Sequence, residues 1–248
     1  MRISNIFGRR LWRHPKWTKA HRWITLLIGV QLLFWIVSGT VFVFNDIDNV
    51  HGDFEFKKPD AVALNEKFLG SKTSAAIRAL EAGLNRDVSP TLIAMTRRLG
   101  RDVYAVYEKG EGTPVGYVDA QTGKLAAPLT EEEASVVALA HYKGTAGIRS
   151  VERLEEAPLE YRGQPLPVFR VDFDDRKNTS FYVSPHSGKV VVRRNWAWRV
   201  FDFFWMLHTM DYRERDDFNH PLIRVSAVFA VMAVMSGAVL LFQRFIPR

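Results

Sequence analysis

The chain has 248 residues and a formal net charge of +7, and it contains no Cys. The absence of Cys excludes disulfides, Cys-ligated zinc and iron–sulfur clusters. Ten of the 34 basic residues lie in the terminal segments: Arg2, Arg9, Arg10, Arg13, Lys16, Lys19, Arg22, Arg224, Arg244 and Arg248. The other 24 Lys and Arg are outnumbered by the 27 Asp and Glu, so the middle of the chain is mildly acidic. This distribution argues against nucleic-acid binding by a central folded domain.

A basic segment over residues 1–22 precedes a stretch, 23–44, that contains no charged residue. At about 1.5 Å per residue this stretch reaches roughly 33 Å, enough to cross a hydrocarbon core of about 30 Å. A cleaved signal peptide is the alternative, because Ser38, Gly39 and Thr40 loosely fit a cleavage site. The apolar run continues past these residues, however, and is too long for a typical signal peptide. We therefore predict an uncleaved transmembrane helix over 23–44.

The next segment, 45–59, is predicted to be a linker. Its sequence NDIDNVHGD contains Asp46, Asp48, His51 and Asp53, a composition similar to that of loops that bind divalent cations. The spacing of these residues fits no defined cation-binding loop. We interpret the segment as solvated chain.

The region after the linker is duplicated, with one unit over 60–128 and a second over 129–194. The clearest matching strings are GYVDAQTGKL, which starts at Gly116, and FYVSPHSGKV, which starts at Phe181. Each follows a longer run in which apolar and polar residues alternate, as in half-buried antiparallel strands. The Gly of each string is expected to supply the turn between two strands.

A helix is predicted at the start of each unit. Residues 71–84 have the apolar period of a helix, and Thr130 with Glu133 forms a capping box before the helix of the second unit. The order is a helix followed by a meander of three or four short strands, repeated once. Helices packed against antiparallel sheets define an α+β fold.

The last third of the chain contains an aromatic stretch and a second apolar run. Residues 195–212 are too short, and too interrupted by Arg199 and Asp202, to span a membrane. Their Trp and Tyr residues favour the membrane interface, so we predict a helix that lies in, or dips into, the outer leaflet. An amphipathic helix packed on the central domain is the alternative. A second transmembrane helix is predicted over 222–243, followed by a tail over 244–248.

The charges beside the two spans predict their orientation. Seven cations precede the first span and two follow the second. By the positive-inside rule both termini are cytoplasmic, and residues 45–221 lie on the opposite side of the membrane.

The order of these features resembles a known family. A helix followed by a meander that ends in GYVDAQTGK or FYVSPHSGK is similar to the PepSY domain, here present twice. Two such units lie between a span that opens with Ala-His-Arg-Trp and a span preceded by Trp-Met-Leu-His. This arrangement resembles the PepSY-associated transmembrane family over nearly the whole chain. Known members usually carry four spans, whereas this chain has two, which puts in doubt any inference that needs a four-helix bundle within one chain.

Three histidines lie at the predicted membrane segments: His21, His208 and His220. The first and the last each precede a span that contains a Ser-Gly pair. These pairs are Ser38 with Gly39 and Ser236 with Gly237. Because the two spans run in opposite directions, the similarity describes an inverted repeat, with chance similarity as the alternative. Small residues let helices approach closely, so we expect these pairs at helix contacts, including those of a homodimer that restores four spans.

The family resemblance implies a cofactor for these histidines. Some members are haem-bearing ferric-siderophore reductases of the bacterial inner membrane. By this resemblance His21, His208 and His220 are candidate ligands of haem b, and residues 45–221 are periplasmic. The two membrane faces are about 30 Å apart, so His21 cannot share one haem with either of the others. A pair across a dimer, or His208 with His220, is then required; the alternative is that His21 and His220 are interfacial residues only.

Two functions remain open on the sequence alone. The first is a haem-b electron-transfer protein, a ferric or siderophore reductase or a subunit of one, that acts in periplasmic reduction. The sequence contains no nucleophile elbow, phosphate-binding loop or dinucleotide fingerprint, so no catalytic residue is predicted and the reductant must come from a partner or the quinone pool. The second is a membrane-anchored binding or regulatory module for a periplasmic protein, and an accessory transporter subunit is a third. The expected partners are the lipid bilayer and a second copy of the chain or a larger membrane complex.

Overall fold

The computed structural model describes residues 15–58, 73–109 and 114–245. Their contacts divide into two compact units. We call the described residues of 1–46 and 200–248 the membrane unit, and those of 47–199 the central unit.

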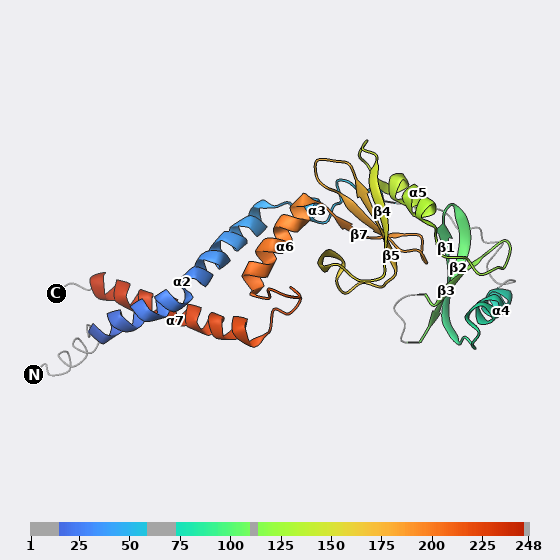
Figure 1. The fold of residues 1–248 in the computed structure, drawn as a ribbon. Helices are drawn as coiled ribbons and strands as arrows, with labels where there is room; N and C mark the ends of the chain where they lie inside the picture. The colour runs from blue at the N-terminus through green and yellow to red at the C-terminus, as the bar shows by residue number, and fades with distance from the viewer. Residues whose placement is uncertain (1–14, 59–72, 110–113, 246–248) are drawn as a thin grey trace, which may run out of the picture. The chain divides into compact units, whose positions relative to one another are not determined.

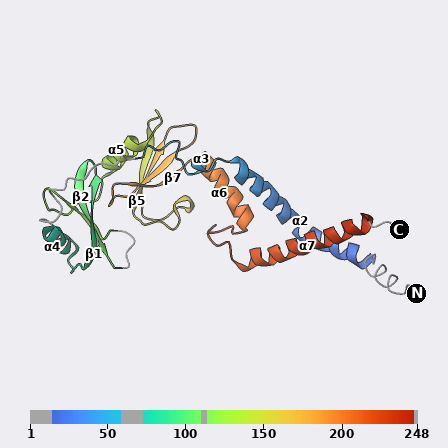
Figure 2. The ribbon, with the colours of Figure 1, turned by 180° about the vertical axis from the view of Figure 1, so that it is seen from behind.

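Two long helices dominate the membrane unit, α2 (Pro15–Phe44) and α7 (Pro221–Phe245). Each is long and apolar enough to cross a membrane. The helices cross in both views of the ribbon, and Ile28 of α2 packs against Ala230 and Ala233 of α7 (Figures 1 and 2). Small alanine side chains let the two backbones approach closely at this crossing. The structure therefore contains an apolar helix at each predicted span.

A third helix, α6 (Trp196–Thr209), begins in the central unit and ends in the membrane unit. It forms within the aromatic stretch. Asn195 caps its first turn, because the Asn195 Oδ1 atom accepts a hydrogen bond from the Trp198 N–H at 2.8 Å. The helix ends at Met210, whose φ of 60° is incompatible with a further helical turn.

The central unit contains the predicted duplication. Its first half has a helix and a three-stranded antiparallel sheet of order β1-β2-β3, and its second half has a helix and a four-stranded antiparallel sheet of order β4-β5-β6-β7. The elements of the first half are α4 (Thr73–Leu84), β1 (Pro90–Arg98), β2 (Arg101–Glu108) and β3 (Gly116–Asp119). Those of the second half are α5 (Glu131–His141), β4 (Ile148–Leu154), the short 3-10 helix η2 (Leu159–Tyr161), β5 (Val168–Phe173), β6 (Ser180–Val183) and β7 (Val190–Arg194). The α+β fold expected from the sequence is confirmed.

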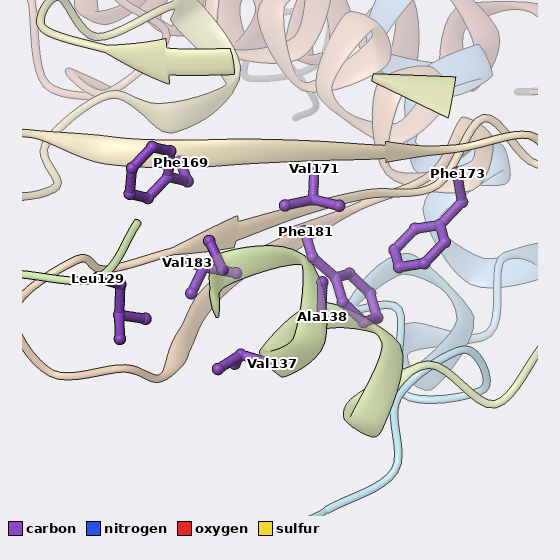
Figure 3. Packing of buried hydrophobic residues seen from close by; sticks show 9 residues of the cluster. Leu129, Val137, Ala138, Phe169, Val171, Phe173, Phe181 and Val183 are labelled. Carbon is purple, nitrogen blue, oxygen red and sulfur yellow. The ribbon is translucent and has the colours of Figure 1, made fainter. Parts of the chain in front are cut away.

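Each half has its own core between the helix and one face of the sheet. In the second half, Val137 and Ala138 of α5 point toward Val171, Phe181 and Val183 on the strands (Figure 3). The helix begins at the predicted capping box, whose two reciprocal hydrogen bonds are both present. The strands are more buried than the predicted half-buried pattern, because Val103–Val106 of β2 and all four residues of β6 are buried on both faces.

The segment predicted as a solvated linker is instead part of the central unit. It includes the short helix α3 (Ile47–Val50), and the Glu55 side chain is buried. The Glu55 carboxylate pairs with Lys177 and accepts a hydrogen bond from Asn195 Nδ2 at 3.1 Å. Asp53, one of the acidic residues of this segment, pairs with Arg193 of β7 at 2.7 Å, so its carboxylate serves a contact within the central unit. Among the described residues, no group of three or more His, Cys, Asp or Glu side chains could hold a metal ion.

One buried arginine joins the two halves of the central unit. Arg98, at the end of β1, donates from its Nη2 atom to the carbonyl of Pro185 at 2.9 Å and to that of Ala127 at 2.6 Å. Burial lowers the pKa of this guanidinium, with a smaller opposing effect of Glu133. A Cβ atom at Gly188 would lie only 2.8 Å from Arg98 Cγ, and the φ of Gly188 is +65°. The turn between β6 and β7 thus needs glycine both for its backbone and for the arginine beside it.

This contact makes the two matching turns of the duplication a natural pair of test sites. Gly123, in the first turn, has a φ of +68° but has no atom within 4 Å of its Cβ position. We expect Gly123→Ala to lower the free energy of unfolding by about 1 kcal/mol through backbone strain. Gly188→Ala should cost about 1–3 kcal/mol more, because Arg98 must also move. Chemical denaturation of both variants in mild detergent measures the difference, and equal costs would contradict the role given to Arg98.

A half-buried carboxylate fixes the start of α6 to the second sheet. Glu160 accepts hydrogen bonds from Arg199 Nε at 2.9 Å and from the Tyr182 hydroxyl at 2.6 Å. Burial alone would raise the pKa of Glu160, but the hydrogen bonds from Arg199 and Tyr182, with the charge of Arg170, outweigh it and lower the pKa. The carboxylate therefore stabilises the folded state only while it is ionised.

The lowered pKa of Glu160 predicts a pH dependence of stability. The contribution of ionised Glu160 to the free energy of unfolding is complete above the ordinary Glu pKa of about 4.3. It is lost as the pH falls through the lower pKa that Glu160 has in the folded protein. We expect the free energy of unfolding to fall in that range, and to fall less steeply in Glu160→Gln. Denaturation at a series of pH values measures this slope. The exposed Glu156→Gln is the matched control, and a slope that Glu160→Gln leaves unchanged would refute the assignment.

Candidate functional site

The end of α6 lies beside the middle of α2 in the membrane unit. The last carbonyl groups of a helix have no partner within the helix, and an unpaired carbonyl in apolar surroundings is costly. The Gln31 Nε2 atom donates to the carbonyl of Leu207 at 2.9 Å. The Trp35 Nε1 atom donates to the carbonyl of His208 at 2.7 Å. Side chains of α2 therefore satisfy two of the carbonyls that α6 leaves free.

The next carbonyl is satisfied by a histidine from the start of the second span. His220 Nε2 lies 2.9 Å from the carbonyl oxygen of Thr209. A carbonyl only accepts, so this nitrogen carries the hydrogen and donates. His220 is thus a capping residue of α6, and its Nε2 atom is not available to bind a metal.

The connection between α6 and α7 is folded rather than an open hydrated hairpin. The Asp211 carboxylate accepts hydrogen bonds from four backbone N–H groups, those of Arg213, Glu214, Asp216 and Asp217, at 3.1–3.2 Å. Burial would raise the pKa of Asp211, but these four donors lower it. Arg215 pairs with the buried Asp202 of α6, and its carbonyl accepts from Trp205 Nε1 at 3.0 Å. The connection is therefore fixed to α6.

His208, the last but one residue of α6, is held by a serine of α2. The Ser38 hydroxyl donates to the carbonyl of Phe34 at 2.6 Å, and His208 Nδ1 lies 2.8 Å from the Ser38 Oγ atom. Because the hydroxyl hydrogen is engaged, the histidine nitrogen is the donor of this second bond. The proton on Nδ1 leaves the Nε2 lone pair of neutral His208 free. The ring lies among aromatic neighbours, with centroids 5.5 Å from Phe42 and 6.4 Å from Trp35.

His21 of α2 is held in the same way by a serine of α7. The Ser236 hydroxyl donates to the carbonyl of Ala233 at 3.0 Å, and His21 Nδ1 lies 2.8 Å from Ser236 Oγ. The Thr25 hydroxyl lies 3.5 Å from each ring nitrogen, too far for a strong bond to either. A Cβ at Gly237 would lie 3.2 Å from His21 Cε1, so a small residue is needed there. The short bond of His21 is therefore the one from Nδ1, and Nε2 has only the 3.5 Å contact with the Thr25 hydroxyl.

The structure thus brings together two His–Ser pairs. Ser38 and Ser236 each contact a histidine from another helix, and Gly237 lies beside one of these histidines. By contrast, Gly39 has no atom within 4 Å of its Cβ position, so it makes no close contact within the chain. The two predicted Ser-Gly pairs therefore differ in what they touch.

The two pairs lie far apart along α2. His21 and Ser38 are separated by 17 positions of one helix, or about 25 Å at 1.5 Å per residue. Since His208 contacts Ser38, His21 and His208 cannot bind one metal ion within a chain. Within residues 15–58 and 196–245, which the structure describes, each level of the membrane unit offers one histidine whose Nδ1 atom is held by a serine.

Two residues of this site were not identified from the sequence. Gln31 is the only amide side chain between Trp23 and Phe44, and polar residues within a span commonly mark a specific contact. That signal could have identified Gln31. Trp35 gave no such signal, because tryptophan is common near membrane interfaces.

A family model described as the PepSY-associated TM region matches residues 18–248. The match includes α2 from residue 18 onward, all of α7 and the whole central unit. Neither the curated proteins nor the solved structures include a significant match.

The cap that Gln31 provides can be removed by one substitution. Gln31→Leu makes the span more apolar, yet it leaves the Leu207 carbonyl without its donor. We expect the free energy of unfolding in mixed micelles to fall by about 1–3 kcal/mol. Thr40→Val is the matched control, because the Thr40 hydroxyl is exposed and bonds only within its own helix. A Gln31→Leu protein as stable as the control would show that the carbonyl does not need this donor.

Proposed function

Because the chain belongs to the family of the PepSY-associated TM region, we propose that this membrane protein holds haem b and transfers electrons across the bacterial inner membrane. The observation that carries the proposal is the pair of histidines, His21 and His208, whose Nδ1 atoms are engaged by serines and whose Nε2 atoms are free. A neutral imidazole that binds iron through Nε2, with its other nitrogen hydrogen-bonded, is a common axial ligand of haem.

A haem with two histidine ligands needs one histidine on each side of its iron. One chain supplies one of these two ligands at the position of His21 and one at the position of His208. We assign His220 to neither site, because its Nε2 atom donates to the Thr209 carbonyl and gives the residue a capping role. A homodimer with its two-fold axis along the membrane normal supplies the missing ligand, since it brings His21 toward the partner's His21 and His208 toward the partner's His208. Such a dimer also restores the four spans that are usual in the family. Gly39, which is open to its surroundings, is suited to a close contact between the two copies.

When bound, haem b supplies one-electron redox chemistry at its iron. The chain's own residues set the conditions for it. Ser38 and Ser236 orient the two imidazole rings, and Phe42 and Trp35 surround His208 with apolar surface that keeps out water. The separation of about 25 Å along α2 supports a site in each half of the bilayer.

The direction of transfer follows from the orientation predicted by the positive-inside rule. With the termini in the cytoplasm, the central unit is periplasmic, and α6 leads from it to His208. The donor is then a cytoplasmic or quinone-linked reductant near His21. The acceptor is a periplasmic protein or a metal complex such as a ferric siderophore.

The proposal is tested by the absorption of the purified protein. We expect a reduced-minus-oxidised spectrum with b-type bands and about one haem per chain. His21→Ala and His208→Ala should each lower the haem content to about half, because each removes one site, and the double variant should bind none. The exposed His51→Ala is the matched control and should retain the full content.

Two further results would count against the proposal. A colourless protein from haem-replete cells would leave the anchored binding module as the better account. Full haem content in a protein that is strictly monomeric by native mass would show that the ligands do not come from two copies.

A further inference from the structure

The central unit contains a groove that the proposed redox chemistry does not use. Its volume is about 910 Å³, and it lies where the two halves of the duplication meet. One wall is the end of β1 and its turn, with Met95 and Arg97. The other wall is α5, with Val137 and Ala140, and the segment that enters β7, with Lys189. The groove therefore exists only because the two halves of the duplication are joined. The hydrogen bond from the buried Arg98 to the Pro185 carbonyl holds its walls together.

The β1 wall presents backbone groups that no other strand uses within the part of the chain that the structure describes. In the sheet order β1-β2-β3, strand β1 lies at the edge. Leu99 and Gly100, with φ values of 48° and 75°, form a two-residue hairpin turn flanked by the pair Arg98 and Arg101. In a two-residue hairpin this flanking pair is hydrogen-bonded, and the pattern then alternates along the strands.

The alternation fixes which residues of β1 face outward. Arg98, Thr96 and Ala94 direct their N–H and C=O groups toward β2. Met95 and Arg97 direct theirs away from the sheet, and both residues line the groove. Met95, Thr96 and Arg97 all line the groove. Because side chains of consecutive strand residues point to opposite faces of the sheet, a groove that touches all three follows the edge of the strand.

The two halves of the duplication treat their edge strands differently. The corresponding edge strand of the second half, β4, carries Arg149, Glu152 and Arg153 among its seven residues. Charges of this kind block the pairing of an edge with another chain. In β1 the charged residues are the last two, Arg97 and Arg98, and the residues from Pro90 to Thr96 include no charge. The edge of β1 is therefore blocked by charges over less of its length than the edge of β4.

The side chains around the groove indicate the composition of its occupant. Its floor is apolar, with Met95, Val137 and Val190. Its rim carries Arg97 and Lys189, and none of the described residues that line it is acidic. Arg97 already pairs with Asp102 at 3.0 Å, so Lys189 is the main cation available to a ligand. Apolar and acidic side chains in alternation complement this surface.

We propose that the groove binds an extended segment of a partner protein, with alternating apolar and acidic side chains, as an additional strand on β1. Backbone hydrogen bonds to Met95 and Arg97 provide affinity, and the apolar floor and Lys189 provide selectivity. This binding function is independent of the histidines of the membrane unit, so it stands or falls separately from the redox proposal.

The test uses the full-length protein in nanodiscs and a fluorescent peptide of alternating valine and glutamate as the probe. We expect saturable binding by fluorescence anisotropy and slower amide exchange over residues 93–97. The same peptide with alternate amides methylated, or with lysine in place of glutamate, should bind at least about tenfold more weakly. Equal binding of the methylated peptide would show that no strand is added.

Charge reversal on the protein locates the site. Lys189→Glu changes an exposed side chain and should weaken binding of the probe about tenfold. Arg153→Glu, the same type of change on the edge of β4, is the control and should have no effect. Absence of probe binding, protection confined to 148–154, or equal effects of the two substitutions would overturn the proposal. Probe binding that appears only when the protein is diluted would also overturn it, because a second copy would then be the natural occupant.

Discussion

The membrane unit depends on one constraint, namely that α6 ends beside the middle of another helix. There its final carbonyl groups must be bonded by side chains. Gln31, Trp35 and His220 donate to three consecutive carbonyls, those of Leu207, His208 and Thr209. These bonds fix α6 against α2 and tie the start of α7 to both, so the position of His208 follows from them.

The same constraint divides the histidines into two roles. His220 uses its Nε2 atom to close the end of α6, and is therefore structural. His21 and His208 use Nδ1 on a serine of another helix, which leaves the nitrogen that metals commonly bind. Each predicted Ser-Gly pair thus supplies a serine that bonds a histidine, but His208 takes the place that the predicted repeat gave to His220 in this relation. His208 belongs to α6 and not to either of the two long apolar helices.

The sequence predicted the parts of the fold that periodicity controls. The apolar helices, the duplicated α+β units and the capping box at Thr130 all follow from local patterns. Contacts between distant residues were beyond reach: nothing local shows that Glu55 is buried against Lys177, or that His208 rather than His220 meets Ser38. The histidines could be selected by residue type and position, but their roles depend on which carbonyls need donors, and that is a property of the folded chain.

The central claim is the assignment of the three ring protons, and histidine ¹⁵N NMR of the haem-free protein in bilayers measures it directly. At a pH where the rings are neutral, the account predicts the Nδ1–H form for His21 and His208 and the Nε2–H form for His220. The Nε2–H form at His21 or His208, or the Nδ1–H form at His220, would contradict it.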